Sequence, residues 1–136
     1  MRKPSLTLAL AATVAALTLP ATAEERTPQV SPFSQITQRV GLSDVTIRFS
    51  RPGVKGRRIW GDVVPMGKIW RTGANEATTI TFEEDVLVEG RPVAAGTYAL
   101  FTVPGEKTWS VILNKDAKQW GAYAHKDADD VVKVDV

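Results

Sequence analysis

One stretch of the sequence, residues 51–76, gathers the side chains that could bind a ligand. It holds five of the ten glycines and two of the four tryptophans, together with six cations and two acids. A sugar-binding surface needs flat aromatic groups and planar polar groups. The stretch supplies both kinds in Trp60, Asp62, Trp70, Arg71, Asn75 and Glu76.

The arginines of the same stretch suit a different ligand. Arg51, Arg57, Arg58 and Arg71 could clamp a phosphate, sulfate or carboxylate through paired hydrogen bonds. The structural alternative is a solvated basic edge, with Arg71 paired to a neighbouring acid so that it pins the loop. The residues leave both interpretations open.

The two acids of the stretch allow a third hypothesis. Asp62 and Glu76 could act in a hydrolase, one as the acid and the other as base or nucleophile. Salt bridges to nearby arginines would lower the pKa of either carboxyl group and remove a general acid. The phosphate-binding pattern GxxxxGK[ST] is absent, so this type of nucleotide hydrolysis is not supported.

Residue composition excludes several kinds of chemistry. The chain has no cysteine and a single histidine, His125, so it offers neither thiolate ligands nor a multi-histidine zinc site. The acids Asp127, Asp129 and Asp130 do not follow the spacing of a helix-loop-helix calcium loop, and we expect a surface turn there. The sequence therefore predicts no metal and no cofactor.

The first residues have the layout of a secretory signal peptide. A charged start, Arg2 and Lys3, precedes the apolar run 6–19, and Ala21-Thr22-Ala23 follows as a cleavage site. Cleavage after residue 23 predicts a periplasmic or secreted protein with no integral membrane segment. Because both early cations leave with the signal, 15 basic and 15 acidic residues remain. A balanced charge argues against nucleic acid as a partner.

Alternating apolar and polar residues predict short strands after a flexible leader, residues 24–32. Residues 33–136 are expected to form a single domain, all-β, either an antiparallel β-sandwich or a partly open barrel with a long ordered loop. The last expected strand ends with the chain, so the domain could lack a final strand. The strands are expected at 35–40, 44–50, 77–82, 86–88, 97–103, 109–114 and 131–136, with Tyr98, Phe101, Trp109 and Trp120 in the core.

Several long motifs resemble one known family. They are SPFSQITQRVG (residues 31–41), DVTIRFSRPGVKGR (44–57), IWGDVVPMGKIWRTGANEATTITF (59–82), AGTYALFTVP (95–104), WSVILN (109–114) and QWGAY (119–123). These motifs resemble the exported bacterial domain-of-unknown-function family numbered twenty-nine eleven. The resemblance implies an exported, mostly β domain and no particular activity.

Three functions remain compatible with these residues. The leading hypothesis is an exported module that binds a glycan or an anionic small molecule through Arg51, Arg57, Trp60, Asp62, Trp70, Arg71, Asn75 and Glu76. The first alternative is a hydrolase that uses Asp62 or Glu76. The second is a structural or protein-partner module of the cell envelope. The residues do not decide whether the protein is an enzyme.

Overall fold

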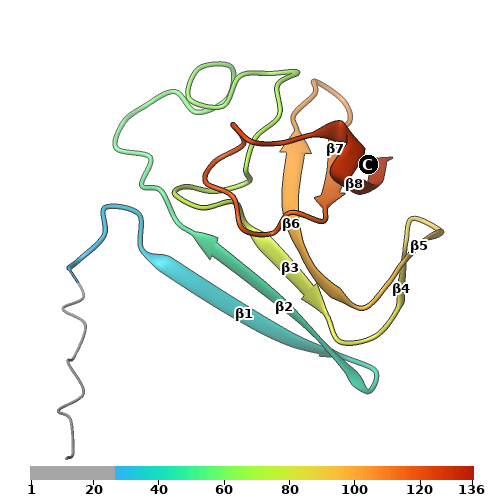
Figure 1. Cartoon of the computed structure of the whole chain (residues 1–136). Helices are drawn as coiled ribbons and strands as arrows, with labels where there is room; N and C mark the ends of the chain where they lie inside the picture. The colour runs from blue at the N-terminus through green and yellow to red at the C-terminus, as the bar shows by residue number, and fades with distance from the viewer. Residues whose placement is uncertain (1–26) are drawn as a thin grey trace, which may run out of the picture.

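Eight short strands form two antiparallel sheets in the part of the chain that the structure describes, residues 27–136 (Figure 1). The structure is a computed structural model. The predicted signal peptide and residues 24–26 lie outside the described residues. The strands are β1 (Phe33–Val40), β2 (Ser43–Ser50), β3 (Thr79–Phe82), β4 (Val86–Val88), β5 (Arg91–Val93), β6 (Gly96–Val103), β7 (Ser110–Asn114) and β8 (Asp130–Asp135).

The larger sheet has six strands in the order β1-β2-β3-β6-β7-β8, and the smaller sheet pairs β4 with β5. The predicted all-β antiparallel class is confirmed, and the larger sheet does not close into a barrel. Among residues 27–136 the only helical element is a short 3-10 turn, η1 (Asp127–Asp129). No helix in this range is long and apolar enough to cross a membrane.

Seven expected strands are present within a few residues, and one strand was missed. No strand was expected between residues 88 and 97, whereas Arg91 and Pro92 belong to β5. Proline cannot donate a backbone hydrogen bond, so it is usually confined to sheet edges. A two-stranded sheet consists only of edges, and Pro92 therefore fits opposite Leu87.

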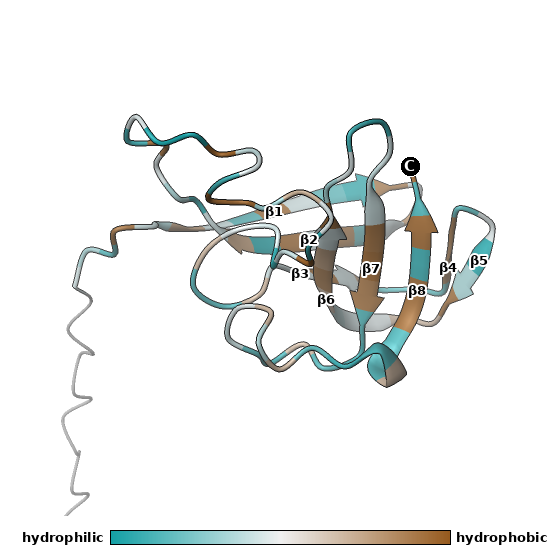
Figure 2. Ribbon diagram, turned by 90° about the horizontal axis from the view of Figure 1, so that it is seen from above, coloured by the Kyte–Doolittle hydropathy of each residue, from teal (hydrophilic) through white to brown (hydrophobic). Residues whose placement is uncertain are grey.

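The central strands are covered by hydrophobic residues on both faces. Strand β6 itself has apolar residues on both of its faces. One cluster joins Tyr98 of β6 to residues of β3, β5, β7 and β8. On the opposite face Phe101 packs with Ala99, Ile112 and Ala77. Figure 2 shows this concentration of hydrophobic residues on β6 and β7, and the alternating bands of β8. The second face is covered by loops and not by another sheet, and these loops carry the candidate site.

The core gives a test of the fold. Phe101 is fully buried, whereas Leu87 is largely exposed on β4. We expect Phe101→Ala to lower the free energy of unfolding by about 3–5 kcal/mol, because it removes a buried ring and leaves a cavity. Leu87→Ala, an exposed control, should change it by less than about 0.5 kcal/mol. Equal losses in urea denaturation would contradict this placement of the core.

Candidate functional site

The long loop between β2 and β3 forms backbone hydrogen bonds with the C-terminal half of β6. Strand β3 pairs only with residues 96–99 of β6, which leaves the backbone of residues 100–103 without a partner on that side. The loop supplies one. The amide of Trp70 donates to Thr102 O at 2.8 Å, and the amide of Thr102 donates to Trp70 O at 3.0 Å. The amide of Leu100 donates to Thr78 O at 2.7 Å. Residues 51–78 are therefore ordered, as the sequence predicts.

Two tryptophans of this loop form a cluster with Trp109, which directly precedes β7. The ring of Trp60 meets Trp70 edge to face, with 5.9 Å between ring centroids, and meets Trp109 at 5.1 Å. Such contacts hold aromatic rings in fixed relative orientations. Trp60 nevertheless stays 49% exposed. The cluster thus fixes an aromatic surface that solvent or a ligand can reach.

The first part of the loop is held by its own arginine. Arg57 Nη2 donates to Gly53 O at 2.7 Å, and Arg57 Nε donates to Val54 O at 3.1 Å. These bonds close residues 53–57 into an arc. Two nitrogens of the Arg57 guanidinium are therefore engaged in hydrogen bonds within the loop. The residue also lines the pocket described below.

The backbone beyond Trp70 is strained. Thr72 and Asn75 have φ of 56° and 60°, in the left-handed region that residues with a Cβ rarely adopt. Thr72 is β-branched, which makes this conformation more unusual still. Its carbonyl accepts from Thr78 Oγ1 at 2.9 Å, and its hydroxyl lies 3.1 Å from Thr102 Oγ1. Strained residues of this kind concentrate at functional sites, where the surroundings hold them in place.

Arg71 directly precedes this strained turn and has no acidic partner. It forms no ion pair with any carboxylate among residues 27–136, and its Nε is buried without a hydrogen-bond acceptor. The predicted alternative, Arg71 paired with Asp62 or Glu76, is therefore not observed. A buried donor without an acceptor costs about 1–3 kcal/mol. Arg71 therefore carries a positive charge that no carboxylate of residues 27–136 balances through an ion pair.

A pocket of about 540 Å³ opens beside the loop. Five of the eight predicted binding residues line it: Arg57, Trp60, Trp70, Arg71 and Asn75. Lys55 adds a third cation that the sequence analysis did not single out, and no acidic residue contributes to the lining. Its apolar wall comes from Val54, Ile59, Val63, Val64 and Ala74 together with the two tryptophans.

The other three predicted residues lie elsewhere. Glu76 lines a neighbouring pocket of about 390 Å³, together with Arg48 and Phe33. Arg51 and Asp62 are exposed and line neither of these two pockets. The structure therefore does not bring Asp62 and Glu76 into a shared pocket.

The segment before β1 separates the two pockets. Gln29 lines the smaller pocket, whereas Val30 and Ser31 line the larger one. The side-chain amide of Asn75 lies 3.4 Å from Gln29 Oε1 and 3.3 Å from Ser31 O. The same nitrogen lies 3.3 Å from Ser50 Oγ at the end of β2. Asn75 therefore acts as a tie between the entering chain and the sheet.

A second loop, residues 115–126, supports the site from the side of the C-terminal strand. The amide of Ala77 donates to Gln119 O at 3.0 Å, and the amide of Gly121 donates to Asn75 O at 3.1 Å. A Cβ on Gly121 would lie 3.3 Å from Arg71 Nη1, so the two loops touch at the arginine. Sequence analysis missed this contact, because no local pattern links residues so far apart.

The placement of Trp120 was wrong. Sequence analysis assigned it to the core, but its side chain is 60% exposed. The period-two pattern that places Tyr98 and Phe101 inside does not extend to Trp120. This residue lies in a loop and forms only an isolated bridge with Glu76.

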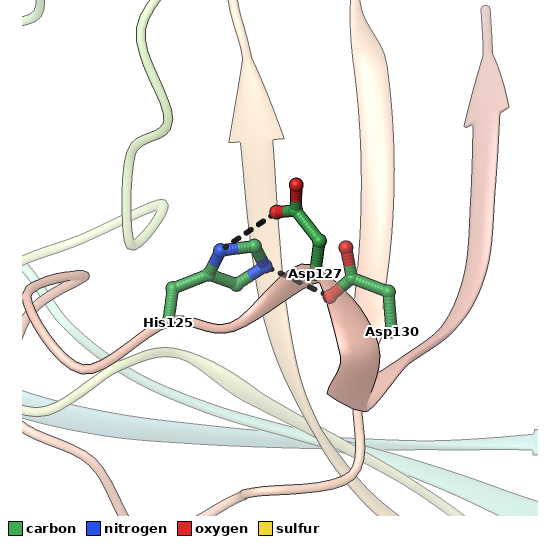
Figure 3. A group of neighbouring side chains, drawn as sticks. All are labelled: His125, Asp127 and Asp130. Carbon is green, nitrogen blue, oxygen red and sulfur yellow. Dashed lines mark hydrogen bonds and ion pairs between the residues drawn. The ribbon is translucent and has the colours of Figure 1, made fainter.

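His125 lies between two carboxylates at the start of β8 (Figure 3). Its Nε2 is 2.8 Å from Asp130 Oδ1, and its Nδ1 is 3.6 Å from Asp127 Oδ1. One ligand atom from each of the three residues lies within 4.8 Å of the others, and the two carboxylates face opposite ring nitrogens. Asp129 instead pairs with Lys115 at 3.0 Å.

Buried polar contacts explain why this group holds its shape. Asp130 Oδ1 also accepts from Asn114 Nδ2 at 2.8 Å, and Asn114 is fully buried. The ring of His125 meets Phe101 edge to face, with 5.1 Å between ring centroids. The group therefore connects the end of β7 to the hydrophobic face beneath the site, and its position indicates a structural role.

Comparison with known proteins gives one match. The sequence profile of the family described as "Protein of unknown function (DUF2911)" matches residues 31–136. No curated protein and no solved structure matches the chain. The matched range contains all eight strands and both loops of the site.

The tie made by Asn75 gives a test of the site. Asn75→Gly removes the amide but tolerates positive φ, whereas Asn75→Ala removes the amide and keeps a Cβ at φ 60°. We expect the glycine variant to lose about 1 kcal/mol of unfolding free energy, and the alanine variant a further 1 kcal/mol or so. Amides of residues 29–31 should exchange hydrogen faster in both variants.

The control for this test is Gly90→Ala. Gly90 has φ of 74°, and nothing lies within 4 Å of an added Cβ. The decrease in unfolding free energy of Gly90→Ala therefore measures only the cost of placing an alanine at positive φ. An alanine variant at residue 75 that is as stable as the glycine variant would contradict the assigned strain. Unchanged exchange at 29–31 would contradict the tie.

Proposed function

Because the chain belongs to the DUF2911 family of proteins of unknown function, we propose its function from the geometry: it binds a small anionic molecule with a flat apolar body. The ligand occupies the pocket of about 540 Å³ beside the loop between β2 and β3. This volume lies in the range of about 300–1,000 Å³ that is usual for small-molecule sites.

One observation carries the proposal. The pocket is lined by Lys55, Arg57 and Arg71 without any acid, and Arg71 has no carboxylate partner among residues 27–136. A carboxylate, sulfate or phosphate group of the ligand would provide the missing counter-charge through short charge-assisted hydrogen bonds. The half-exposed ring of Trp60 and the apolar wall would then contact the body of the ligand.

An anionic ligand fits this pocket better than a neutral glycan does. Glycan sites bind hydroxyl groups with acceptors as well as donors, and a carboxylate is the strongest acceptor. Asp62 and Glu76 do not line the pocket, and the amide of Asn75 is close to three protein oxygens. The charged groups that face the pocket are donors only.

The same arrangement argues for binding and not for hydrolysis by Asp62 and Glu76. A pair of carboxylates on opposite sides of one bond must open into the same cavity. Glu76 lines the smaller pocket, and Asp62 lines neither. The strained residues Thr72 and Asn75 and the guanidinium of Arg71 lie beside this open pocket, and strained residues concentrate at functional sites, which favours binding over a purely structural role.

Two dyes with the same aromatic frame can test the proposed ligand class. Anilinonaphthalene sulfonate carries an anionic group, and N-phenylnaphthylamine lacks it. We expect the sulfonate to bind at one site, to quench tryptophan fluorescence and to bind at least about tenfold more tightly than the neutral dye. A hydrogen bond to a charged group is worth about 1.5–3 kcal/mol, and 1.4 kcal/mol corresponds to a tenfold change in affinity.

Two arginine variants sharpen this experiment. Arg71→Gln should remove most of the preference for the sulfonate and leave the weak binding of the neutral dye unchanged. Arg91→Gln is the matched control, because Arg91 is exposed on β5 and outside the pocket lining. Equal affinities for the two dyes, or an equal effect of both substitutions, would contradict the proposal.

A further inference from the structure

Strand β1 is an unprotected edge of the six-stranded sheet. It spans eight residues, Phe33–Val40, and its only partner among the described strands is β2 (Figure 1). The two strands pair without a register shift over the whole length of β1. Natural edge strands are usually short or carry charged residues, proline or a bulge, since these features prevent pairing with another chain. Strand β1 is long, has no proline or bulge, and carries a single charge, Arg39.

The opposite edge of the sheet is protected. Strand β8 has the sequence DVVKVD, so three of its six residues are charged. Its pairing with β7 is also interrupted by a register shift at Leu113 and Asn114. Since the same sheet carries these features at one edge and lacks them at the other, the open edge at β1 is a specific property of that strand.

The face of β1 that continues the core side of the sheet carries two exposed apolar side chains, Ile36 and Val40, alternating with the polar residues Ser34 and Gln38. Direct pairing aligns Ile36 with Ile47, Ile80 and Tyr98 across four strands, and paired residues project from the same face of a sheet. Tyr98 belongs to the hydrophobic core and Ile80 packs against it. At the end of this row Ile36 is 56% exposed, and Val40 on the same face is 61% exposed.

We propose that β1 pairs with β1 of a second copy of this chain, antiparallel, about a two-fold axis that passes beside Ile36. Such an axis, perpendicular to the sheet, keeps the apolar face of both copies on the same side and produces one continuous sheet. Ile36 then lies opposite Ile36 of the second copy. The remaining pairs are Gln35 with Thr37, Ser34 with Gln38, and Phe33 with Arg39.

The charges of β1 are compatible with this self-pairing. Arg39 is the only charged residue of the strand, and it forms an ion pair with Asp44 on β2. The hydrogen bond from Arg39 lowers the pKa of Asp44, so the pair is intact at neutral pH. Two copies therefore meet without an unbalanced charge. Arg39 of one copy approaches the ring of Phe33 of the other, a favourable contact between a cation and an aromatic face.

A second copy fits this edge better than an unrelated strand, because the order of residues in β1 is complementary to itself. The central pair is apolar, the next pairs are polar with polar, and the outer pair joins an aromatic ring to a cation. An interface of one strand pair belongs to the small, transient class. We expect a dissociation constant on the order of 10–100 μM.

The absence of cysteine allows a direct test of this pairing. Ile36→Cys introduces one thiol per chain, which the proposed axis places opposite its own copy. Directly paired Cα atoms lie about 4.5–5.5 Å apart, within the span of a disulfide. The controls are Leu42→Cys, in the exposed turn between β1 and β2, and Val131→Cys, on the opposite edge strand β8.

Under mild oxidation we expect Ile36→Cys to form disulfide-linked dimers about 100-fold faster than either control, because association raises the effective concentration of the two thiols. Sedimentation of the unmodified protein should show a reversible monomer–dimer equilibrium. Ile36→Lys should abolish the dimer, whereas Val131→Lys should leave it intact. A monomer at all concentrations, equally rapid crosslinking of the three thiols, or a dimer that survives Ile36→Lys would overturn the proposal.

Discussion

The backbone of β6 imposes the constraint on which the site depends. This strand has eight residues, but its neighbour β3 covers only the first four. The buried amides and carbonyls that remain must find partners, because an unpaired backbone group in the interior is costly. Trp70 and Thr78 provide those partners. The long loop thus packs against the sheet because it supplies the hydrogen-bond partners that β6 lacks. The loop itself contains no strand.

That attachment determines the geometry of the loop between its two anchor points. The loop contacts β6 at Trp70 and again at Thr78. The residues between these two anchor points must therefore form a compact turn. The left-handed conformations of Thr72 and Asn75 and the tight surroundings of Gly73 are the local consequence. The backbone strain of this segment therefore originates in the unequal lengths of β3 and β6.

The sequence predicts most of the fold and only part of the site. Alternating residues identify β2, β6 and β7 because the period of two is a local property of each strand. Large apolar residues such as Trp70 likewise indicate that the glycine-rich loop is ordered. The pairing of Asn75 with Gly121 cannot be predicted in this way, because nothing within either segment encodes the other. Trp120 was misplaced because it lies in a loop, where no alternating pattern indicates which side chains are buried.

The loops of the site are also part of the core. Phe101 and Ile112 are buried on a face that no second sheet covers, and the residues packed over them come from the two loops, through Ile69, Ala77 and Ala122. Any ligand that binds only the folded pocket stabilises those loops by mass action. Because the loops shield the core, that stabilisation extends to the central strands. Binding at this pocket would therefore be coupled to the stability of the whole sheet through β6.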